Sequence, residues 1–168
     1  SNLVGSETII LSGNGVTGNK NVGESKALTN ISGLSLGNGS NGGLASNYTL
    51  SGGTHKINVI KRPITISGAK TYDGSTTVQN TFISTLSNRA GGETLNITGS
   101  GTVNSAAVGT NKTISLGSLA LSDNSGSASN YELSSGTFDI NVRNITFVGT
   151  RHYDGTTDAN TSNFTATF

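Results

Sequence analysis

The sequence predicts an all-β protein built from tandem antiparallel β modules, and three observations lead to this prediction. Motifs return in the same order: Tyr72-Asp73-Gly74-Ser75-Thr76 returns as Tyr153-Asp154-Gly155-Thr156-Thr157, and Ser46-Asn47-Tyr48 as Ser129-Asn130-Tyr131. Between the motifs, apolar and β-branched residues alternate with polar ones, which is the period-two pattern of half-buried strands. Glycine-rich stretches such as 37–39 and 91–92 separate these runs and suit turns that need a positive φ.

The order of the motifs divides the chain into three pieces. Residues 62–142 carry one full set and are expected to form a complete β module, whereas residues 1–61 form an incomplete module lacking its opening strand. Residues 143–168 supply the opening segment of the next module. We expect strands where alternation is clearest, at residues 57–59, 64–66, 95–97, 114–116, 138–142 and 145–148. One helical turn is expected within residues 77–87, where Val78, Phe82 and Leu86 are four residues apart.

Two sheet arrangements fit a module of this kind: a two-layer sandwich, and a β-grasp-like sheet with one short helical turn. Spacing between repeated motifs varies from 81 residues (153 − 72) to 86 residues (93 − 7). We place these length changes in loops, because an insertion inside a paired strand shifts its register. The connections between modules are short, so we expect the modules to stack into a stiff, elongated rod or filament.

The composition excludes several partner classes. Charged residues make up 11% of the chain and the net charge is +1, which gives no electrostatic footprint for nucleic acid or an anionic membrane. No run of about 18 apolar residues is present, so we expect no membrane insertion. The chain has no Cys, and its stability must therefore come from strand pairing and small cores.

The repeated motifs have structural interpretations. Asp-Gly at 73–74 and 154–155 suits a tight turn, because Asp accepts from a backbone amide and Gly tolerates positive φ. In the second motif the Asn closes a turn and the Tyr anchors the next strand. We expect all four tyrosines to be largely buried, at Tyr48, Tyr72, Tyr131 and Tyr153.

No set of residues predicts catalysis. His55 and His152 stand opposite Phe138 and Thr71 in the repeat, so the two modules share no His site. The Asp123-Asn124-Ser125 loop weakly resembles a calcium loop, but the other module has no carboxylate there and an EF-hand needs more of them. We therefore predict no enzyme, no catalytic residues, no metal and no cofactor.

The Tyr-Asp-Gly motifs, the Val22-Gly23 and Val108-Gly109 pairs, and the Ser-Asn-Tyr-x-Leu motifs together resemble the YDG-type repeat domains of large bacterial secreted adhesins, the filamentous-haemagglutinin-like exoproteins. The resemblance covers nearly the whole chain. It implies an extracellular, secreted or surface-attached stalk module with a structural role and names no catalytic residue. The alternative is a carbohydrate-binding or surface-binding β module, which needs an exposed aromatic platform that this sequence offers little material to build.

The two ends of the chain match an internal stretch when joined. Residues 164–168 followed by 1–7 parallel residues 82–93, with Phe164 matched to Phe82. We expect residues 143–168 to meet residues 1–61 of an identical copy, through a covalent array or by strand donation. A host or biofilm surface is the other partner class that the resemblance implies. The expected inter-copy contact residues are Phe164, Phe168, Leu3, Ile9 and Ile10.

Overall fold

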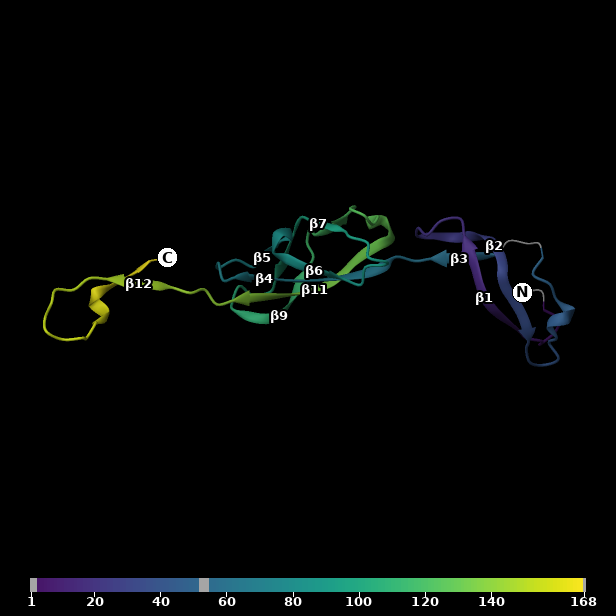
Figure 1. Cartoon of the computed structure of the whole chain (residues 1–168), viewed down its shortest axis with the longest axis horizontal. Helices are drawn as coiled ribbons and strands as arrows, with labels where there is room; N and C mark the ends of the chain where they lie inside the picture. Colours follow the sequence, from purple (N-terminus) through teal and green to yellow (C-terminus); the bar gives the residue numbers. More distant parts are fainter. Residues whose placement is uncertain (1–2, 52–54, 168) are drawn as a thin grey trace. The chain divides into compact units, whose positions relative to one another are not determined.

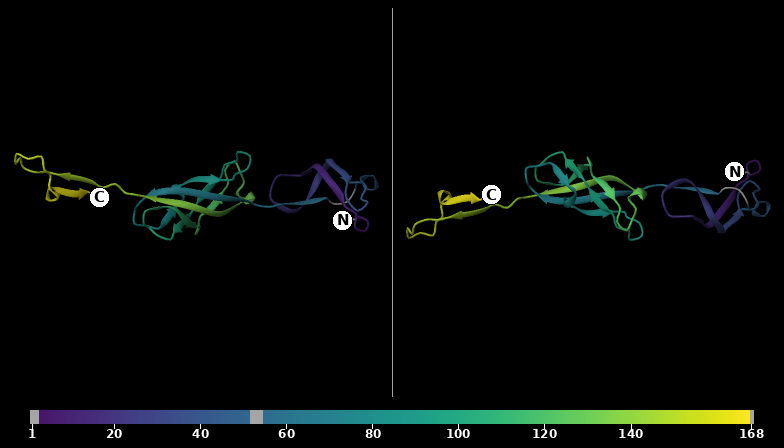
Figure 2. Two further views of the ribbon diagram at one scale, coloured as in Figure 1. Left: turned by 90° about the horizontal axis from the view of Figure 1, so that it is seen from below. Right: turned by 90° about the horizontal axis from the view of Figure 1, so that it is seen from above.

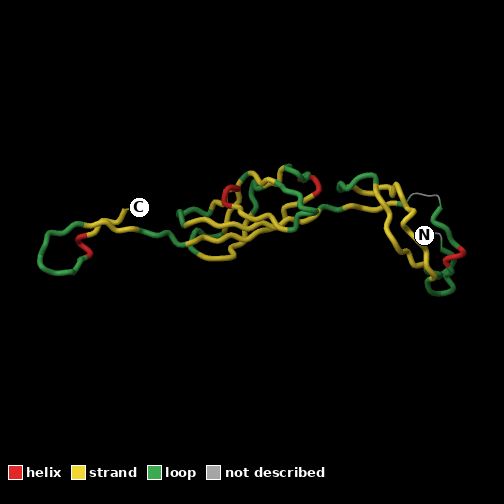
Figure 3. The backbone as a smooth tube through the Cα atoms, viewed as in Figure 1, coloured by secondary structure: helices red, strands yellow, loops and turns green. Residues whose placement is uncertain are grey.

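The computed structural model describes residues 3–51 and 55–167, and within these ranges the protein is all-β. Strands make up 51% of the described residues, and the only helical elements among them are three-residue 3-10 turns (Figure 3). No helix in the described ranges has the length and apolar character needed to cross a membrane. The chain splits into two compact units, Ser1–Arg62 with Ser129–Glu132, and Pro63–Ala128 with Leu133–Phe168.

The largest sheet lies within residues 62–142 and has six strands (Figure 1). Its order is β5-β8-β9-β11-β4-β6. A second, two-stranded sheet pairs β10 with β7. The strand bounds are β4 Arg62–Thr71, β5 Thr77–Gln79, β6 Ile83–Ser87, β7 Asn96–Thr98, β8 Ser100–Val103, β9 Gly109–Ser115, β10 Ala120–Ser122 and β11 Tyr131–Asn141.

The opening and closing strands of this module, β4 and β11, are neighbours at the centre of the sheet. The Ser134 hydroxyl donates to the Ile64 carbonyl at 3.1 Å, and the Tyr72 amide donates to the Asn141 carbonyl at 2.9 Å. Both contacts advance along the chain in the same direction, so the two strands run parallel. β6 pairs antiparallel with β4, and β9 antiparallel with β11. The strands that open and close the module are therefore adjacent and parallel within one curled sheet.

The expected helical turn within residues 77–87 is a single 3-10 turn, η2 Asn80–Phe82, between strands β5 and β6. Val78 is completely buried in β5, which pairs with β8. The residues on both sides of the turn are therefore in paired strands, β5 and β6. The four-residue spacing of apolar positions reflects these two strands and the turn between them, and not a longer helix.

The core of the structure lies in this module. Phe138 is fully buried at its centre, with its ring 6.4 Å from that of Phe82. All buried apolar side chains of the described residues lie between positions 62 and 142: Ile64, Ile66, Val78, Leu95, Val103, Ile114, Leu119, Tyr131, Phe138 and Ile140. This small core agrees with the small cores expected from the sequence.

The N-terminal part forms a three-stranded sheet of order β1-β2-β3. Its strands are β1 Ile9–Thr17, β2 Gly23–Asn38 and β3 Lys56–Val59, with the 3-10 turn η1 Ala45–Asn47. In the described residues, β1 and β3 each pair on one side only. None of the apolar side chains described here is buried.

Strand registers give the structural correspondence between modules. Lys26 is opposite Ile57 in β2–β3, and Lys112 is opposite Phe138 in β9–β11. Ile57 is therefore the counterpart of Phe138, 81 residues later (138 − 57). By strand register His55 thus corresponds to Gly136, whereas the repeated sequence matches His55 to Phe138, two residues away.

Residues 145–167 form a hairpin that repeats the β4–β6 pair. β12 Thr146–Gly149 and β13 Phe164–Thr167 pair antiparallel and lie side by side in both views of Figure 2, with the 3-10 turn η4 Thr161–Asn163 before β13. Gly149 pairs with Phe164 as Gly68 pairs with Ile83. The counterpart of Phe164 is thus Ile83, one position beyond the sequence match to Phe82.

Candidate functional site

The first candidate site is the Tyr-Asp-Gly turn, which is closed by a buried lysine. The Lys70 ammonium lies 2.9 Å from Asp73 Oδ1 and donates to the carbonyls of Ser75 at 2.8 Å and Thr77 at 2.9 Å. Asp73 Oδ1 also accepts from the Ser75 amide at 2.9 Å, and Gly74 has φ +76°. The predicted Asx turn is present. Lys70 was missed, although a base three residues before the Asp occurs in both motifs.

The second copy of the turn has the same design with arginine in place of lysine. Arg151 Nη1 donates to Asp154 Oδ1 at 2.6 Å, and Nη2 donates to the Thr156 carbonyl. Asp154 Oδ1 accepts from the Thr156 amide at 3.0 Å, and Gly155 has φ +76°. The polar groups of both turns therefore satisfy one another, which is the role of a structural turn.

The same contacts lower both aspartate pKa values. Hydrogen bonds from Lys70 and then from the Ser75 amide hold the pKa of Asp73 below its ordinary 3.8. For Asp154, hydrogen bonds from the Thr156 amide and hydroxyl come first and Arg151 adds to them, with the same downward effect on the pKa. Each carboxylate is stabilised in its ionised form, as a turn-closing acceptor needs to be.

The four tyrosines are not equally buried, so that expectation was partly wrong. Tyr131 is 4% exposed and anchors β11 as predicted, whereas Tyr48 is half-buried. Tyr72 is 42% exposed and Tyr153 is 94% exposed. Tyr72 directly follows Thr71, the last residue of β4, and so lies beyond the part of the strand that packs against the core. The counterpart, Tyr153, lies in the hairpin segment, where no partner strand like β11 is present in the described residues.

In the Asn-Tyr motif, the tyrosine of the N-terminal unit is tied to a glutamate. The Tyr48 hydroxyl donates to Glu7 Oε2 and accepts from the Val4 amide at 3.2 Å. The Glu7 hydrogen bond raises the pKa of Tyr48 above 10.0. Asn47 ends the 3-10 turn η1.

Asn130 stands at the end of a turn, as expected, and its side chain makes further contacts. In the unit that contains it, Asn130 Oδ1 accepts from the Val22 amide at 2.9 Å, and its amide group donates to Asn21 Oδ1 at 3.1 Å. The turn that it ends is the 3-10 turn η3 Ala128–Asn130. The side chain thus holds a neighbouring stretch of backbone.

The loop at Asp123 has a structural explanation. Asp123 Oδ1 accepts from the Ala128 amide at 2.7 Å, as Asn38 Oδ1 accepts from the Ala45 amide at 2.8 Å. The carboxylate is thus replaceable by an amide at this position. Throughout the described ranges, no three His, Cys, Asp or Glu residues gather as metal ligands.

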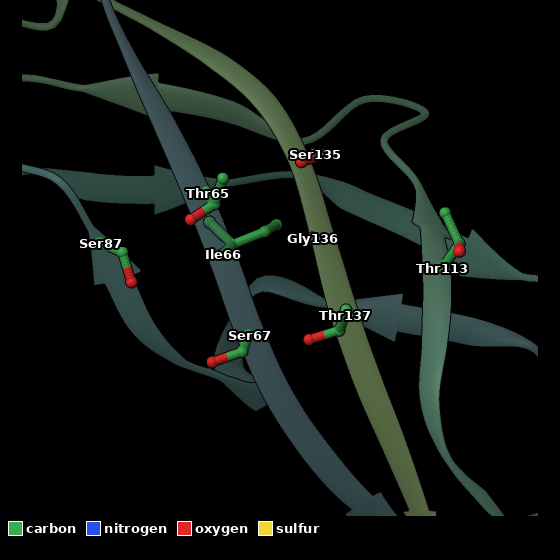
Figure 4. Close-up of a pocket in the computed structure, with 8 residues that line it drawn as sticks. All are labelled: Thr65, Ile66, Ser67, Ser87, Thr113, Ser135, Gly136 and Thr137. Atoms are coloured by element: carbon green, nitrogen blue, oxygen red, sulfur yellow. The ribbon is translucent and has the colours of Figure 1, made fainter.

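The outer face of the six-stranded sheet carries a shallow hollow of about 460 Å³ (Figure 4). Hydroxyl-bearing side chains dominate its lining, and they come from β4, β6, β9 and β11. Alternation along β4 and β11 turns these side chains away from Ile64 and Phe138 in the core. The lining residues are Thr65, Ile66, Ser67, Ser87, Thr113, Ser135, Gly136 and Thr137.

The N-terminal unit has an apolar hollow of about 380 Å³ instead. It is lined by Leu3, Ile9, Leu11, Leu36, Tyr48, Thr49, Leu50 and His55. Two of the expected inter-copy contacts, Leu3 and Ile9, belong to this lining. Ile10 follows Ile9 in a strand and so lies on the opposite face, where it is 58% exposed.

The other expected contacts lie at the opposite end of the chain. Phe164 is 41% exposed and packs edge-on against Phe147, with ring centroids 6.4 Å apart. Phe168 lies outside the described residues. Phe147 and Ile57, each about half exposed, were not among the expected contacts. Their exposure follows from which strands pair, which the sequence alone does not show.

Comparison with known proteins gives one match. The family model of the YDG domain matches residues 58–138, nearly the extent of the complete module. No curated protein and no solved structure matches the chain. Residues 58–138 of this chain are therefore a YDG domain.

Proposed function

We propose that this chain is a structural repeat segment of a secreted bacterial surface adhesin or extracellular filament, in which β modules stacked head to tail form a stalk. The observation that carries the proposal is the second opening hairpin. Residues 145–167 rebuild the β4–β6 pair of the YDG domain with the same turn chemistry. Repetition of one module suits a spacing role, because an array gains length with each added copy.

The site chemistry supports a structural role. The charged groups of the Tyr-Asp-Gly turns are occupied by one another: Lys70 with Asp73, and Arg151 with Asp154. Neither turn presents a nucleophile next to a base, the arrangement expected of covalent catalysis. The absence of Cys and the low charge of the chain fit a stalk stabilised by strand pairing.

Surface labelling of intact bacteria that carry this protein tests the proposal. Antibodies raised against the 168-residue chain are expected to label unpermeabilised cells, and external protease is expected to remove the label. Stretching a single molecule is expected to give regular unfolding events, each releasing about 28 nm for a module of roughly 80 residues. Label that appears only after lysis contradicts the proposal.

A carbohydrate-binding or surface-binding module is the second candidate function. It is favoured by the hydroxyl-lined hollow of Figure 4 and by the exposed ring of Tyr72. This function would be supported if the chain binds a glycan array, loses this binding in the Thr137→Val variant and keeps it in Thr146→Val, a control residue outside the hollow. Equal binding by both variants, or none by the unchanged chain, would remove it.

A further inference from the structure

One edge of β3 has no partner strand among the described residues, and the β12–β13 hairpin exposes an apolar face; together they match two parts of one sheet. We propose that residues 145–167 of one copy complete the β1-β2-β3 sheet of a second copy, head to tail. The partner is a second copy of this chain. The inference rests on the proposed stalk function, for which it names the contact that joins neighbouring modules.

The complete module shows where the hairpin belongs. There β11 has β9 on one side and β4 on the other, with β6 beyond β4. By register, β3 corresponds to β11 and β12–β13 corresponds to β4–β6. The unpaired side of β3 is therefore the side that β4 occupies in the YDG domain, and β12 is the matching strand. An unpaired strand edge of this kind is a template for pairing with another chain.

Burial gives the second argument. Ile64, Ile66 and Phe138 form the centre of the YDG domain and are 0%, 2% and 0% exposed. Their counterparts in the two unpaired parts are all half exposed: Ile145 50%, Phe147 57% and Ile57 49%. Each of the two parts therefore exposes apolar side chains at positions that the matching strand covers in the YDG domain. Removing such apolar area from water drives association.

Side-chain volumes give the third argument, because the replacements compensate. Ile66 becomes the larger Phe147 in the hairpin, while Phe138 becomes the smaller Ile57 in the sheet. The YDG domain has two phenyl rings in contact, Phe82 and Phe138, and the hairpin brings two of its own. The joined core thus keeps two rings, and a core that conserves total volume tolerates such exchanges.

The contact differs from the YDG domain at one point. A Cβ added at Gly136 would lie 2.4 Å from Ile66 Cγ1, so β11 and β4 approach closely there. The counterpart of Gly136 is His55, whose side chain lines the apolar hollow. In the proposed β3–β12 pair, His55 therefore stands where the YDG domain has only a glycine, at the ordinary spacing of paired strands.

The sheet and the hairpin are different surfaces of the chain. When the hairpin of one copy binds the sheet of another, the pair still has one sheet and one hairpin available for further copies. Such a contact is heterologous and extends as an open filament. Analytical ultracentrifugation of the purified 168-residue chain tests this over a concentration series. We expect species at multiples of 17.0 kDa that lengthen with concentration. A single species of 17.0 kDa at about 1 mM overturns the proposal, and so does growth that stops at two copies.

Two variants each block one side of the contact: Phe147→Asp in the hairpin and Ile57→Asp in the sheet. Both side chains are half exposed, so the fold of each separate copy is expected to remain, as circular dichroism will show. Alone, each variant is expected to stay at 17.0 kDa, whereas a 1:1 mixture forms a pair with one of each. A mixture without pairs, or filaments from either variant alone, overturns the proposal.

Matched controls add the same charge on the outer face of each strand. Val148→Asp stands next to Phe147 at the position of Ser67, and Asn58→Asp stands next to Ile57 at the position of Asp139. Both are expected to associate like the unchanged chain. If copies fail to associate but surface labelling is intact, the proposed contact is wrong and the stalk function depends on covalently joined repeats alone. If labelling is lost but copies associate, the stalk function is wrong and the contact between copies remains.

Discussion

At the scale of single residues, Lys70 is the main polar member of the core. Lysine is rarely buried unless paired, yet Lys70 is 5% exposed and bonds two carbonyls and a carboxylate. It ties the end of β4 to the start of β5 across the Asp73-Gly74 turn. A small domain without disulfides thereby fixes the turn by a charged group that satisfies backbone acceptors.

Replacing Lys70 by Met should destabilise residues 62–142 by about 1–3 kcal/mol, because the Ser75 and Thr77 carbonyls lose their donor. Amide hydrogen exchange in β4 and β5 measures the change. The exposed Lys56 is the matched control, and Lys56→Met is expected to have little effect. Equal protection in both variants would contradict the role given to Lys70.

The pKa of Asp73 should rise toward 3.8 in the Lys70→Met variant, since the hydrogen bond from Lys70 is the largest cause of its lowering. The lowered pKa means that Asp73 contributes stability above about pH 3.8, and that this stability is lost as pH falls through the lower folded pKa. Carbon-detected NMR titration of the carboxylate measures both values. An Asp73 pKa unmoved by the substitution would leave the Ser75 amide as its main determinant.

Tyr131 and Tyr153 occupy repeated motifs but differ in burial, so their substitution should affect stability differently. Tyr131→Ala should cost about 3 kcal/mol or more, because a core of ten apolar side chains leaves a cavity when it loses a ring. Tyr153→Ala should cost almost nothing in the isolated chain, since Tyr153 is 94% exposed. Urea unfolding followed by exchange in β11 compares the two, and similar losses would show that Tyr153 is covered in solution.

At the scale of elements, strand alternation predicted the strands of the YDG domain well, because each has a core face and a water face. The expected strand at 64–66 lies within β4, whereas those at 114–116 and 138–142 overlap β9 and β11, each of which ends one residue earlier than expected. Alternation could not give the partner of a strand. The parallel contact of β4 with β11, and the correspondence of Ile57 with Phe138, depend on registers between residues far apart in sequence.

The close approach of β4 and β11 at Gly136 should tolerate no side chain. Gly136→Ala is expected to destabilise residues 62–142 by about 1–3 kcal/mol, because its Cβ would lie 2.4 Å from Ile66 Cγ1 and 2.6 Å from the Ile66 carbonyl. Thermal unfolding by calorimetry measures this. The neighbouring Ser135→Ala faces the outer hollow and serves as the control. A stable Gly136→Ala variant would show that the two strands separate easily.

At the scale of the whole molecule, burial is distributed unevenly along the chain. The buried apolar side chains of the described residues all belong to positions 62–142, while the sheet of residues 9–59 and the hairpin of 145–167 keep their apolar faces half exposed. Local stability follows buried contacts, so the YDG domain and its flanking parts should open separately. A single unfolding free energy therefore does not describe this chain.

Hydrogen exchange at two protein concentrations should separate these parts. In dilute solution, amides of β4 and β11 exchange slowly, whereas those of β3 and β12 exchange quickly because one side of each strand is unpaired in the described structure. Raising the concentration should protect β3 and β12 together, since association stabilises only the parts that pair across copies. β4 should stay unchanged and acts as the internal control. Protection of β3 without β12 would mean that some other surface covers the sheet, and the module would then be completed by a partner different from the hairpin.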